Sequence, residues 1–384
     1  MNRKTILWIY NHPLKPEAGG TERITSLVMR GLSANGHKCL GIMVIDSVKG
    51  IVNYDNIEVH DIYSFLKQKH VDTVINQCGH GKEMLEFFLE EGGMKWHDEG
   101  GRIITCLHYD PKPYSIHYQF RTKPNKSIRD YFVIIKTWLL EKWYARQDQK
   151  RIGVIYKYNY INSDFYVLLS ETFILYVKVS LGMNELPKLV AINNPLTFDC
   201  IATESVIDTK KNVILVVSRM YEYQKRISLV LKVWEKLSVK SIFKDWTLKI
   251  VGDGDDLNEY KEYALLHNLK RISFEGQQSP EQYYRDAKIF LMTSQMEGWG
   301  LTLTESLQYG VVPVAFDKCS AFHDIIEDGV NGFLVREGKM SCFINKIENL
   351  AKNQRLWKQM SKNALNSAEK FRIDVIIKKW EKII

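Results

Sequence analysis

The sequence lacks several features of secreted and membrane-spanning proteins. Its six cysteines are scattered with no paired spacing, which favours reduced thiols over a disulfide framework or a zinc site. No window of about 18 apolar residues occurs, so no segment is predicted to span a membrane. The opening MNRKTILWIYNHP has too short an apolar run for a signal peptide and continues as a strand pattern. These absences predict a cytoplasmic protein.

Repeats and a dinucleotide fingerprint are also missing. No repeat with a period of roughly 20–50 residues and no low-complexity segment is visible, which argues against a solenoid or a disordered chain. Gly252-Asp253-Gly254 follows an apolar run, but Leu257 occupies the third glycine position of the nicotinamide fingerprint. A nicotinamide-type site there is poorly supported.

What is present is a chain of 384 residues with 45% hydrophobic and 26% charged residues, enough for two globular domains. The formal net charge is +8. The excess lies between residues 111 and 160, and such a patch suits an anionic membrane, a phosphorylated substrate or nucleic acid. The cations there are Lys112, Arg121, Lys123, Lys126, Arg129, Lys136, Lys142, Arg146, Lys150, Arg151 and Lys157.

Strand and helix patterns alternate along both halves of the chain. The predicted strands of the first half are residues 5–10, 39–45, 71–76, 102–107, 166–169 and 188–192, and its helices are 21–34, 129–151 and 172–181. The second half has predicted strands 212–218, 246–251, 272–274, 289–292 and 311–316, and helices 227–237, 257–268, 280–287 and 301–309. This alternation predicts two Rossmann-like parallel α/β domains, 1–196 and 212–372, joined by a polar linker at 197–211 and followed by an amphipathic segment at 373–384.

Residues 289–316 contain the most informative pattern. A buried strand is followed by a loop with Gly298, Trp299 and Gly300, and then by a helix. Glu297 precedes this helix and Glu305 lies within it. A carboxylate accepts two hydrogen bonds from a vicinal diol, so the stretch predicts a site for sugar-like hydroxyls. The alternative is that one glutamate is a solvated loop residue and the other an ordinary helix-surface charge.

Further candidates follow other predicted strands. Because ligands of open parallel sheets bind at the carboxyl ends of strands, we expect one ligand in a cleft between two domains. Arg219 and Lys225 could hold a diphosphate, or be solvated surface cations. His108 could contact a sugar hydroxyl, or be satisfied by the backbone. Gly19-Gly20 could approach a phosphate or sugar, although a simple turn is its commoner meaning.

Taken together, these residues resemble the retaining glycosyltransferases of family 4. The motifs ILVVSR with Lys225, IVGDG, FEGQ, EGWGLTLTES, YGVVPVAF and EDGVNGFLV stand in the family's order and spacing between residues 212 and 335. Glu297 and Glu305 match its signature of two glutamates separated by seven residues. In the first half the match is limited to Gly19-Gly20 with Glu22, to His108, and to Asn194-Pro195.

The resemblance implies a GT-B fold, in which two Rossmann-like domains face a central cleft and the C-terminal helix returns to the N-terminal domain. It implies the donor-side roles as well. Arg219 and Lys225 would bind the donor diphosphate, Glu305 the ribose and Glu297 the donor sugar. The loop closing over the donor would be Gly19-Gly20, and His108 would approach the donor sugar. The remaining donor-binding positions would be Gly252 and the amides of Gly298, Trp299, Gly300 and Leu301.

The activity so implied is transfer of a hexose-type sugar from a nucleotide-diphosphate sugar to a hydroxyl of a glycan or lipid-linked saccharide. Retention at the anomeric carbon, no metal or other cofactor, and a UDP-sugar rather than a GDP-sugar are expected. The setting would be assembly of a surface polysaccharide or glycolipid. Two departures from the family pattern occur: residues 318–326 lack a usual glycine, with Asp324 at the acidic place, and Trp299 replaces a more usual Phe.

Acceptor choice belongs to the first half, where the basic helix 129–151 also carries aromatic residues. It could lie on the inner face of a membrane, or pack against its domain with a solvated basic face. Rival functions are a nucleotide-sugar epimerase or hydrolase and a non-catalytic nucleotide-sugar-binding protein. No nucleic-acid-binding module is recognised, so nucleic acid is not an expected partner.

Overall fold

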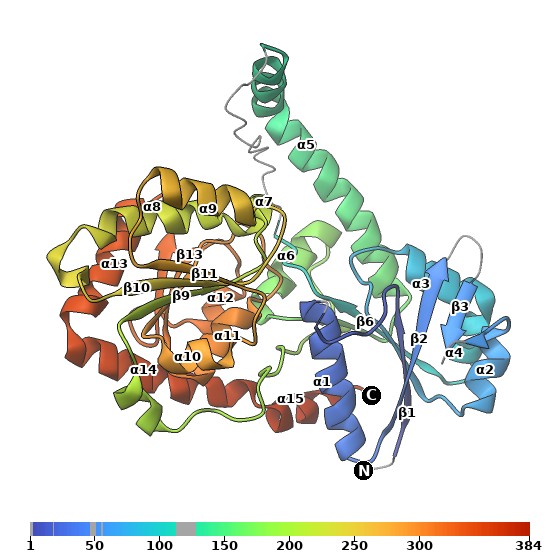
Figure 1. The fold of residues 1–384 in the computed structure, drawn as a ribbon. Helices are drawn as coiled ribbons and strands as arrows, with labels where there is room; N and C mark the ends of the chain where they lie inside the picture. The colour runs from blue at the N-terminus through green and yellow to red at the C-terminus, as the bar shows by residue number, and fades with distance from the viewer. Residues whose placement is uncertain (1–2, 18, 47–50, 55–56, 113–127) are drawn as a thin grey trace. The chain divides into compact units, whose positions relative to one another are not determined.

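The computed structural model of the chain describes residues 3–17, 19–46, 51–54, 57–112 and 128–384. It divides into two compact units (Figure 1). The first comprises Met1–Pro195 and Ile373–Ile384, and the second comprises Leu196–Arg372. Among the described residues, no helix is both long and apolar enough to cross a membrane.

The first unit is built on an eight-stranded sheet whose order is β4-β3-β2-β1-β5-β6-β7-β8. Six strands, from β2 to β8 in that order, are parallel, whereas β3 and β4 add an antiparallel edge. Four consecutive residues of β1 are fully buried, as expected for a parallel strand covered on both faces. The strands are β1 Thr5–Tyr10, β2 Lys38–Asp46, β3 Ile51–Tyr54, β4 Ile57–Glu58, β5 Thr73–Asn76, β6 Arg102–Leu107, β7 Phe165–Leu168 and β8 Leu189–Ala191.

Helices cover this sheet, and the last helix of the chain is one of them. Helix α15 lies against α1, the red ribbon beside the blue one in Figure 1. A Cβ added at Gly31 of α1 would lie 2.7 Å from Ile377 of α15, so glycine permits this close approach. Trp380 then packs on Trp8 of β1, with ring centroids 5.8 Å apart. The helices are α1 Gly20–Ala34, α2 Ile62–Gln68, α3 Glu83–Phe88, α4 Met94–Asp98, α5 Ile128–Ile161, α6 Glu171–Leu181 and α15 Ile373–Trp380.

The second unit has a six-stranded parallel sheet with the order β11-β10-β9-β12-β13-β14. Numbered within the unit, this is the order 3-2-1-4-5-6 of dinucleotide-binding domains. The direction of winding reverses between β9 and β12, where such sheets bind their ligands. The strands are β9 Val213–Val217, β10 Thr247–Val251, β11 Ile272–Gly276, β12 Ile289–Met292, β13 Val312–Asp317 and β14 Phe333–Arg336.

One apolar core joins this sheet to its helices, and residues 197–211 contribute to it. Rather than forming a free linker, these residues belong to the second unit. They include a 3-10 helix, Glu204–Thr209, whose Val206 and Ile207 are buried in the core. The helices are α7 Glu222–Lys225, α8 Ile227–Ser238, α9 Leu257–Leu266, α10 Glu281–Asp286, α11 Leu301–Gln308, α12 Phe322–Ile325, α13 Met340–Lys352 and α14 Gln354–Ala368.

Candidate functional site

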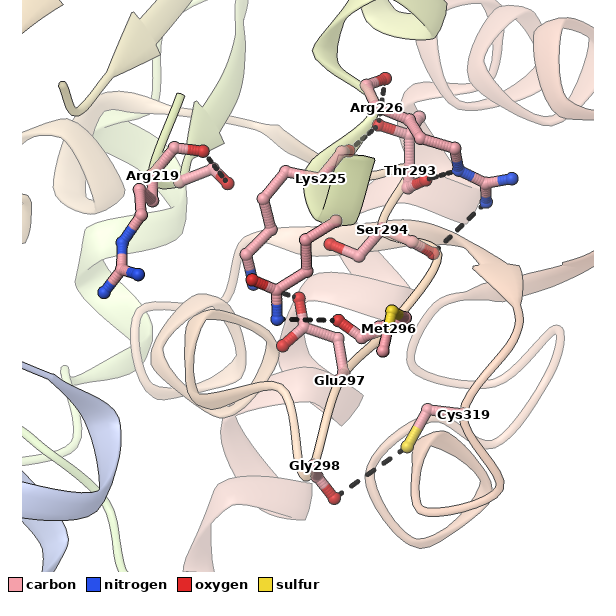
Figure 2. A network of polar contacts seen from close by, with 11 residues as sticks. Arg219, Lys225, Arg226, Thr293, Ser294, Met296, Glu297, Gly298 and Cys319 are labelled. Atoms are coloured by element: carbon pink, nitrogen blue, oxygen red, sulfur yellow. Dashed lines mark hydrogen bonds and ion pairs between the residues drawn. The ribbon is translucent and has the colours of Figure 1, made fainter. Parts of the chain in front are cut away.

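The strand ends at the reversal point in the second unit bring two of the predicted residues together. Lys225 ends α7, which follows β9, and Glu297 lies in the loop after β12. Their Nζ and Oε1 atoms are 2.5 Å apart, and the side chains are only 17% and 12% exposed (Figure 2). Arg219, two residues beyond β9, is exposed and lies to one side of this pair. The alternative of a solvated surface cation is therefore excluded for Lys225, as is that of a solvated loop residue for Glu297.

A residue that the sequence analysis missed holds this arrangement in place. Arg226 directly follows α7 in a left-handed conformation, with φ of +51°. Its guanidinium group is buried and donates to the backbone oxygens of Thr293 and Ser294, at 2.8 and 3.2 Å, and forms an ion pair with Glu337 at 2.6 Å. These bonds fix the loop after β12 to the end of α7, and thereby place Glu297 beside Lys225. Its adjacency to Lys225 was the only signal of this role in the sequence.

The glycine loop after Glu297 leads into α11. Gly300 has φ of +93° and precedes the helix, and a Cβ there would lie 3.0 Å from the ring of Phe322. Trp299 turns inward, only 2% exposed, and packs edge-on against Phe371. The side chain of Trp299 is thus structural, and the backbone amides of residues 298–301 stand at the N-terminus of α11. A helix N-terminus favours a negative ligand group such as a phosphate.

Glu305 is not a surface charge of α11. Its side chain is 1% exposed, and two hydroxyl groups donate to its carboxylate. Thr197 donates to Oε1 over 2.8 Å, and Tyr284 donates to Oε2 over 2.9 Å. The alternative of a solvated helix charge is therefore excluded for Glu305. A buried carboxylate with fixed donors is oriented before any ligand binds.

Gly252 is required by the backbone next to it. The residue has φ of +133°, and a Cβ would lie 1.9 Å from the carbonyl oxygen of Ser218. Its amide donates to the carbonyl oxygen of Gly276 over 2.8 Å. The glycine lets the segments after β9 and β10 lie against each other and against the last residue of β11. Gly252 therefore has a structural role that does not depend on a ligand.

In the first unit, His108 follows β6 and belongs to a chain of hydrogen bonds. Its Nε2 atom lies 2.6 Å from Oε1 of Gln77, which also accepts from the hydroxyl of Thr25 over 3.1 Å. With the Gln77 oxygen as a double acceptor, Nε2 carries the proton and Nδ1 is the basic nitrogen. Burial, with a smaller contribution from His80, lowers the pKa of His108 to about 4, so the imidazole is neutral at neutral pH. His108 lines a small cavity with Trp8, Gln77 and Trp380.

The Gly19-Gly20 pair begins α1. Gly19 is the N-cap residue, with an extended backbone, and Gly20 is the first helical residue. A Cβ at Gly19 would lie 2.3 Å from the Glu22 carboxylate, so this helix start already faces a negative charge. A hydroxyl-bearing group fits that environment better than a phosphate does.

Only part of the predicted basic segment falls within the described structure. Residues 113–127, with Arg121, Lys123 and Lys126, lie outside it, as do the side chains of residues 128–142, 144 and 145, with Arg129, Lys136 and Lys142. Among the described side chains, those of Arg146, Lys150, Arg151 and Lys157 are exposed. Arg146 and Lys150 line a shallow groove with Trp143 and Ser180, where α5 passes α6.

Comparison with known families gives this geometry a chemical context. Residues 199–367, almost the whole of the second unit, match the family of glycosyl transferases group 1. The chain carries a group 1 glycosyl transferase domain. The Lys225–Glu297 pair, the glycine loop and Glu305 all lie inside this domain.

Relatives of the group 1 domain occur in polysaccharide assembly. The chain is 29% identical over 185 residues to the amylovoran biosynthesis glycosyltransferase AmsD of Erwinia amylovora, an alignment of 47% of this chain and 50% of that protein. It is 32% identical over 138 residues to the lipopolysaccharide 1,6-galactosyltransferase of Escherichia coli, covering 34% of this chain and 37% of that one. The chain thus spans half or less of the length of these relatives.

Solved structures match over both units. HepE of Anabaena, in complex with UDP and glucose, aligns with 99% of this chain and 99% of its own, with a TM-score of 0.69 and 15% identity. At this identity the likeness shows the fold alone. Two Rossmann-like units, with parallel strands and glycosyltransferase neighbours, make this a GT-B fold, as predicted from the sequence.

Proposed function

We propose that the chain is a retaining glycosyltransferase, which moves a hexose-type sugar from a nucleotide-diphosphate sugar to a hydroxyl group of a glycan or lipid-linked saccharide. The observation that carries the proposal is the pairing of Lys225 with Glu297, over 2.5 Å, at the reversal point of a sheet that matches group 1 glycosyl transferases. A cation and a carboxylate at one strand edge suit a donor that has a diphosphate at one end and sugar hydroxyls at the other.

The donor would bind along the carboxyl ends of β9 and β12. Lys225 and Arg219 would hold the diphosphate oxygens, and phosphate would compete with Glu297 for the Lys225 ammonium group. Glu297, released in part from Lys225, would accept hydrogen bonds from the transferred sugar, while Glu305 would accept from the ribose diol. The amides at the start of α11 would complete the phosphate and sugar contacts. UDP is the nucleotide we favour, since HepE is a fold neighbour solved with UDP and glucose.

In the transfer step the anomeric carbon loses its bond to the diphosphate oxygen, which leaves with the bonding electron pair. The acceptor hydroxyl oxygen forms the new bond on the same face, and its proton passes to the departing diphosphate. Lys225 and Arg219 would stabilise the charge that grows on this leaving group, without a metal ion. A donor group of this kind contributes roughly 10²–10³-fold to a rate. Neutral His108 and the Gly19-Gly20 turn are proposed to contact the sugar.

The proposed acceptor and the proposed biosynthetic setting are inferred from the related proteins. AmsD is named for amylovoran biosynthesis, and the E. coli relative for a lipopolysaccharide galactosyltransferase. We propose an acceptor of this general kind, used on the cytoplasmic side of a membrane. The exposed cations of α5, next to exposed Trp143 and Val154, would face anionic lipid headgroups.

Nucleotide release tests the function directly. The chain should release UDP from a UDP-hexose only when a saccharide acceptor is added, and NMR of the product should show the anomeric configuration of the donor. UDP release at the same rate without acceptor favours a hydrolase or epimerase, and the inverted anomer contradicts retention. Tight UDP binding with no turnover of any UDP- or GDP-sugar favours a binding protein.

A further inference from the structure

Two stacked tyrosines lie behind the group 1 domain's glycine loop, and each donates to a glutamate. Tyr284 of α10 donates to Glu305, whereas Tyr309, the residue after α11, donates to Glu281 over 2.7 Å. Their rings are nearly parallel, with an interplanar angle of 8° and centroids 6.2 Å apart. Both rings are almost fully buried. The two hydroxyls therefore have the same chemistry, but they reach different carboxylates: Glu305 is buried, whereas the Glu281 side chain is 43% exposed and also pairs with Arg285.

Tyr284 is held from both ends. The ammonium group of Lys210, itself buried, donates to the carbonyl oxygens of Tyr284 and Arg285 over 3.0 and 3.4 Å, which anchors the end of α10. The ring of Tyr284 also packs edge-on against Phe198, with centroids 6.1 Å apart. Phe198 directly follows Thr197, the second hydroxyl donor to Glu305. Backbone and ring contacts therefore fix the position from which the hydroxyl reaches Glu305.

We propose that Tyr284 is a positioning residue for recognition of the ribose diol, in that its hydroxyl sets the orientation in which the Glu305 carboxylate meets the nucleotide. The inference rests on the proposed role of Glu305. The terminal torsion of a glutamate is broad, so an unanchored carboxylate must be ordered when the ligand binds. A carboxylate has about four acceptor positions, so protein and ligand hydroxyls can share it. Two fixed protein donors remove the ordering cost before the diol arrives.

The experiment compares UDP with 2′,3′-dideoxy-UDP, which lacks both ribose hydroxyls. The readout is the dissociation constant of the dideoxy nucleotide divided by that of UDP, both measured by calorimetry on the full chain. In Tyr284→Phe, which keeps the ring, UDP binding should weaken about tenfold, while binding of the dideoxy nucleotide stays near the parent value. The ratio should fall by the same factor. A merely structural role of Tyr284 would weaken both nucleotides alike and leave the ratio unchanged, which would overturn the inference.

Tyr309→Phe is the matched control, because it deletes the equivalent hydroxyl of the stacked partner, and it should keep the parent ratio. If Tyr284→Phe does not fold, Thr197→Val tests the same orientation through the other donor. Tenfold loss of UDP binding in Tyr309→Phe as well would also overturn the inference, since stacking rather than the Glu305 contact would then be responsible.

Glu305→Ala separates the inference from the proposed function. If the ratio falls toward one in Glu305→Ala but stays at the parent value in Tyr284→Phe, the result supports the ribose role of Glu305 and rejects positioning by Tyr284. A parent chain that binds the two nucleotides equally, or binds UDP not at all, rejects the ribose role itself and the inference with it.

Discussion

Lys225 is the residue on which the proposed transfer chemistry depends most directly. In the structure its ammonium group is paired with Glu297 in a largely buried position, so its loss would remove an ion-pair partner of that carboxylate as well as a proposed phosphate ligand. We expect Lys225→Ala to lower kcat by roughly 10²–10³-fold, in line with loss of one preorganised donor to the leaving group.

Lys211→Ala is the matched control for that measurement. Lys211 also pairs with a carboxylate, that of Asp286 at 2.9 Å, but its own side chain is 65% exposed, against 17% for Lys225. Its loss should change kcat less than about twofold, as for other exposed ion pairs. Near-normal activity of Lys225→Ala would contradict the proposal that Lys225 binds the donor diphosphate.

His108 gives the first unit a defined pH dependence. Its pKa is about 4 in the folded chain, below the ordinary value of 6.5, because burial disfavours the imidazolium ion. Between these two values the unfolded chain binds the proton and the folded chain does not. The free energy of unfolding therefore decreases, through this histidine, as the pH falls from 6.5 towards 4. Above pH 6.5 the contribution of His108 to this free energy does not change with pH.

NMR titration of the histidine signals and urea unfolding check this expectation. The His108 signal should remain that of a neutral imidazole at pH 5.5, and His108→Gln should show a smaller loss of unfolding free energy between pH 7 and pH 5 than the parent. Gln77→Glu, which would place a carboxylate beside Nε2, should raise the pKa of His108. Titration of His108 near 6.5 in the parent chain would contradict a neutral imidazole in this partly buried position.

At the scale of secondary-structure elements, Gly252 shows how a glycine can be required by the backbone. Gly252→Ala would place a methyl group 1.9 Å from the Ser218 carbonyl oxygen, at φ of +133°. We expect it to lower the free energy of unfolding by more than about 3 kcal/mol, or to prevent folding, because backbone must move. Gly276→Ala is the control: its φ is +70° with open space around the Cβ, so a loss of only about 1 kcal/mol is expected in thermal or urea unfolding.

Alternation of elements was readable from the sequence because most strands are short apolar runs that end in glycine or polar residues. Residues 289–316 were predicted as strand, loop, helix and strand, and the structure has β12, α11 and β13 there. The antiparallel strands β3 and β4 were missed. Strand β4 has only two residues, Ile57–Glu58, too few for any periodicity to appear.

Tertiary packing explains the other differences between the predicted and the observed structure. The helix predicted to end at Arg151 continues to Ile161, and Gly153 lies inside it, where a Cβ would come within 2.8 Å of the Ser180 carbonyl oxygen of α6. Glycine here permits close packing of two helices instead of ending one. Likewise, Lys225 and Glu297 were predicted to follow strands, but the only sequence signal for Arg226 was its adjacency to Lys225, because its role depends on carbonyl groups that only the folded loop presents.

For the whole molecule, the first unit depends on residues from the end of the chain. Ile377 of α15 is buried against Gly31, whereas Ile373 in the same helix is 37% exposed. We expect Ile377→Ala to lower the free energy of unfolding of the first unit by about 2–4 kcal/mol, through lost burial and the cavity left behind. Ile373→Ala should cost about half as much or less. The UDP binding proposed for the group 1 domain should be retained in both variants.

The membrane association proposed above would depend on the exposed cations of α5. The combined change of Arg146, Lys150 and Lys157 to glutamate should weaken binding to vesicles of phosphatidylcholine with phosphatidylserine by roughly 100-fold, at about 1 kcal/mol per cation. The same charge reversal at Lys232, Lys236 and Lys261 of the second unit, all exposed, serves as the control and should have little effect. Equal binding by both triple variants would contradict a role for α5.

Because α15 belongs to the first unit, the order in which the ribosome makes the chain differs from the order in which its units can be completed. Residues 1–195 are synthesised before residues 196–372. However, Trp8 can pack on Trp380, and Arg102 can donate to the carbonyl oxygens of Ile383 and Ile384, only after the end of the chain has been made. Residues 196–372 are made in the interval and form a continuous unit that can fold as soon as it is synthesised. The first unit to be translated is therefore the last to close, and a nascent chain stalled before residue 373 should expose the apolar surface of α1 and β1 to chaperones while its second unit is already folded.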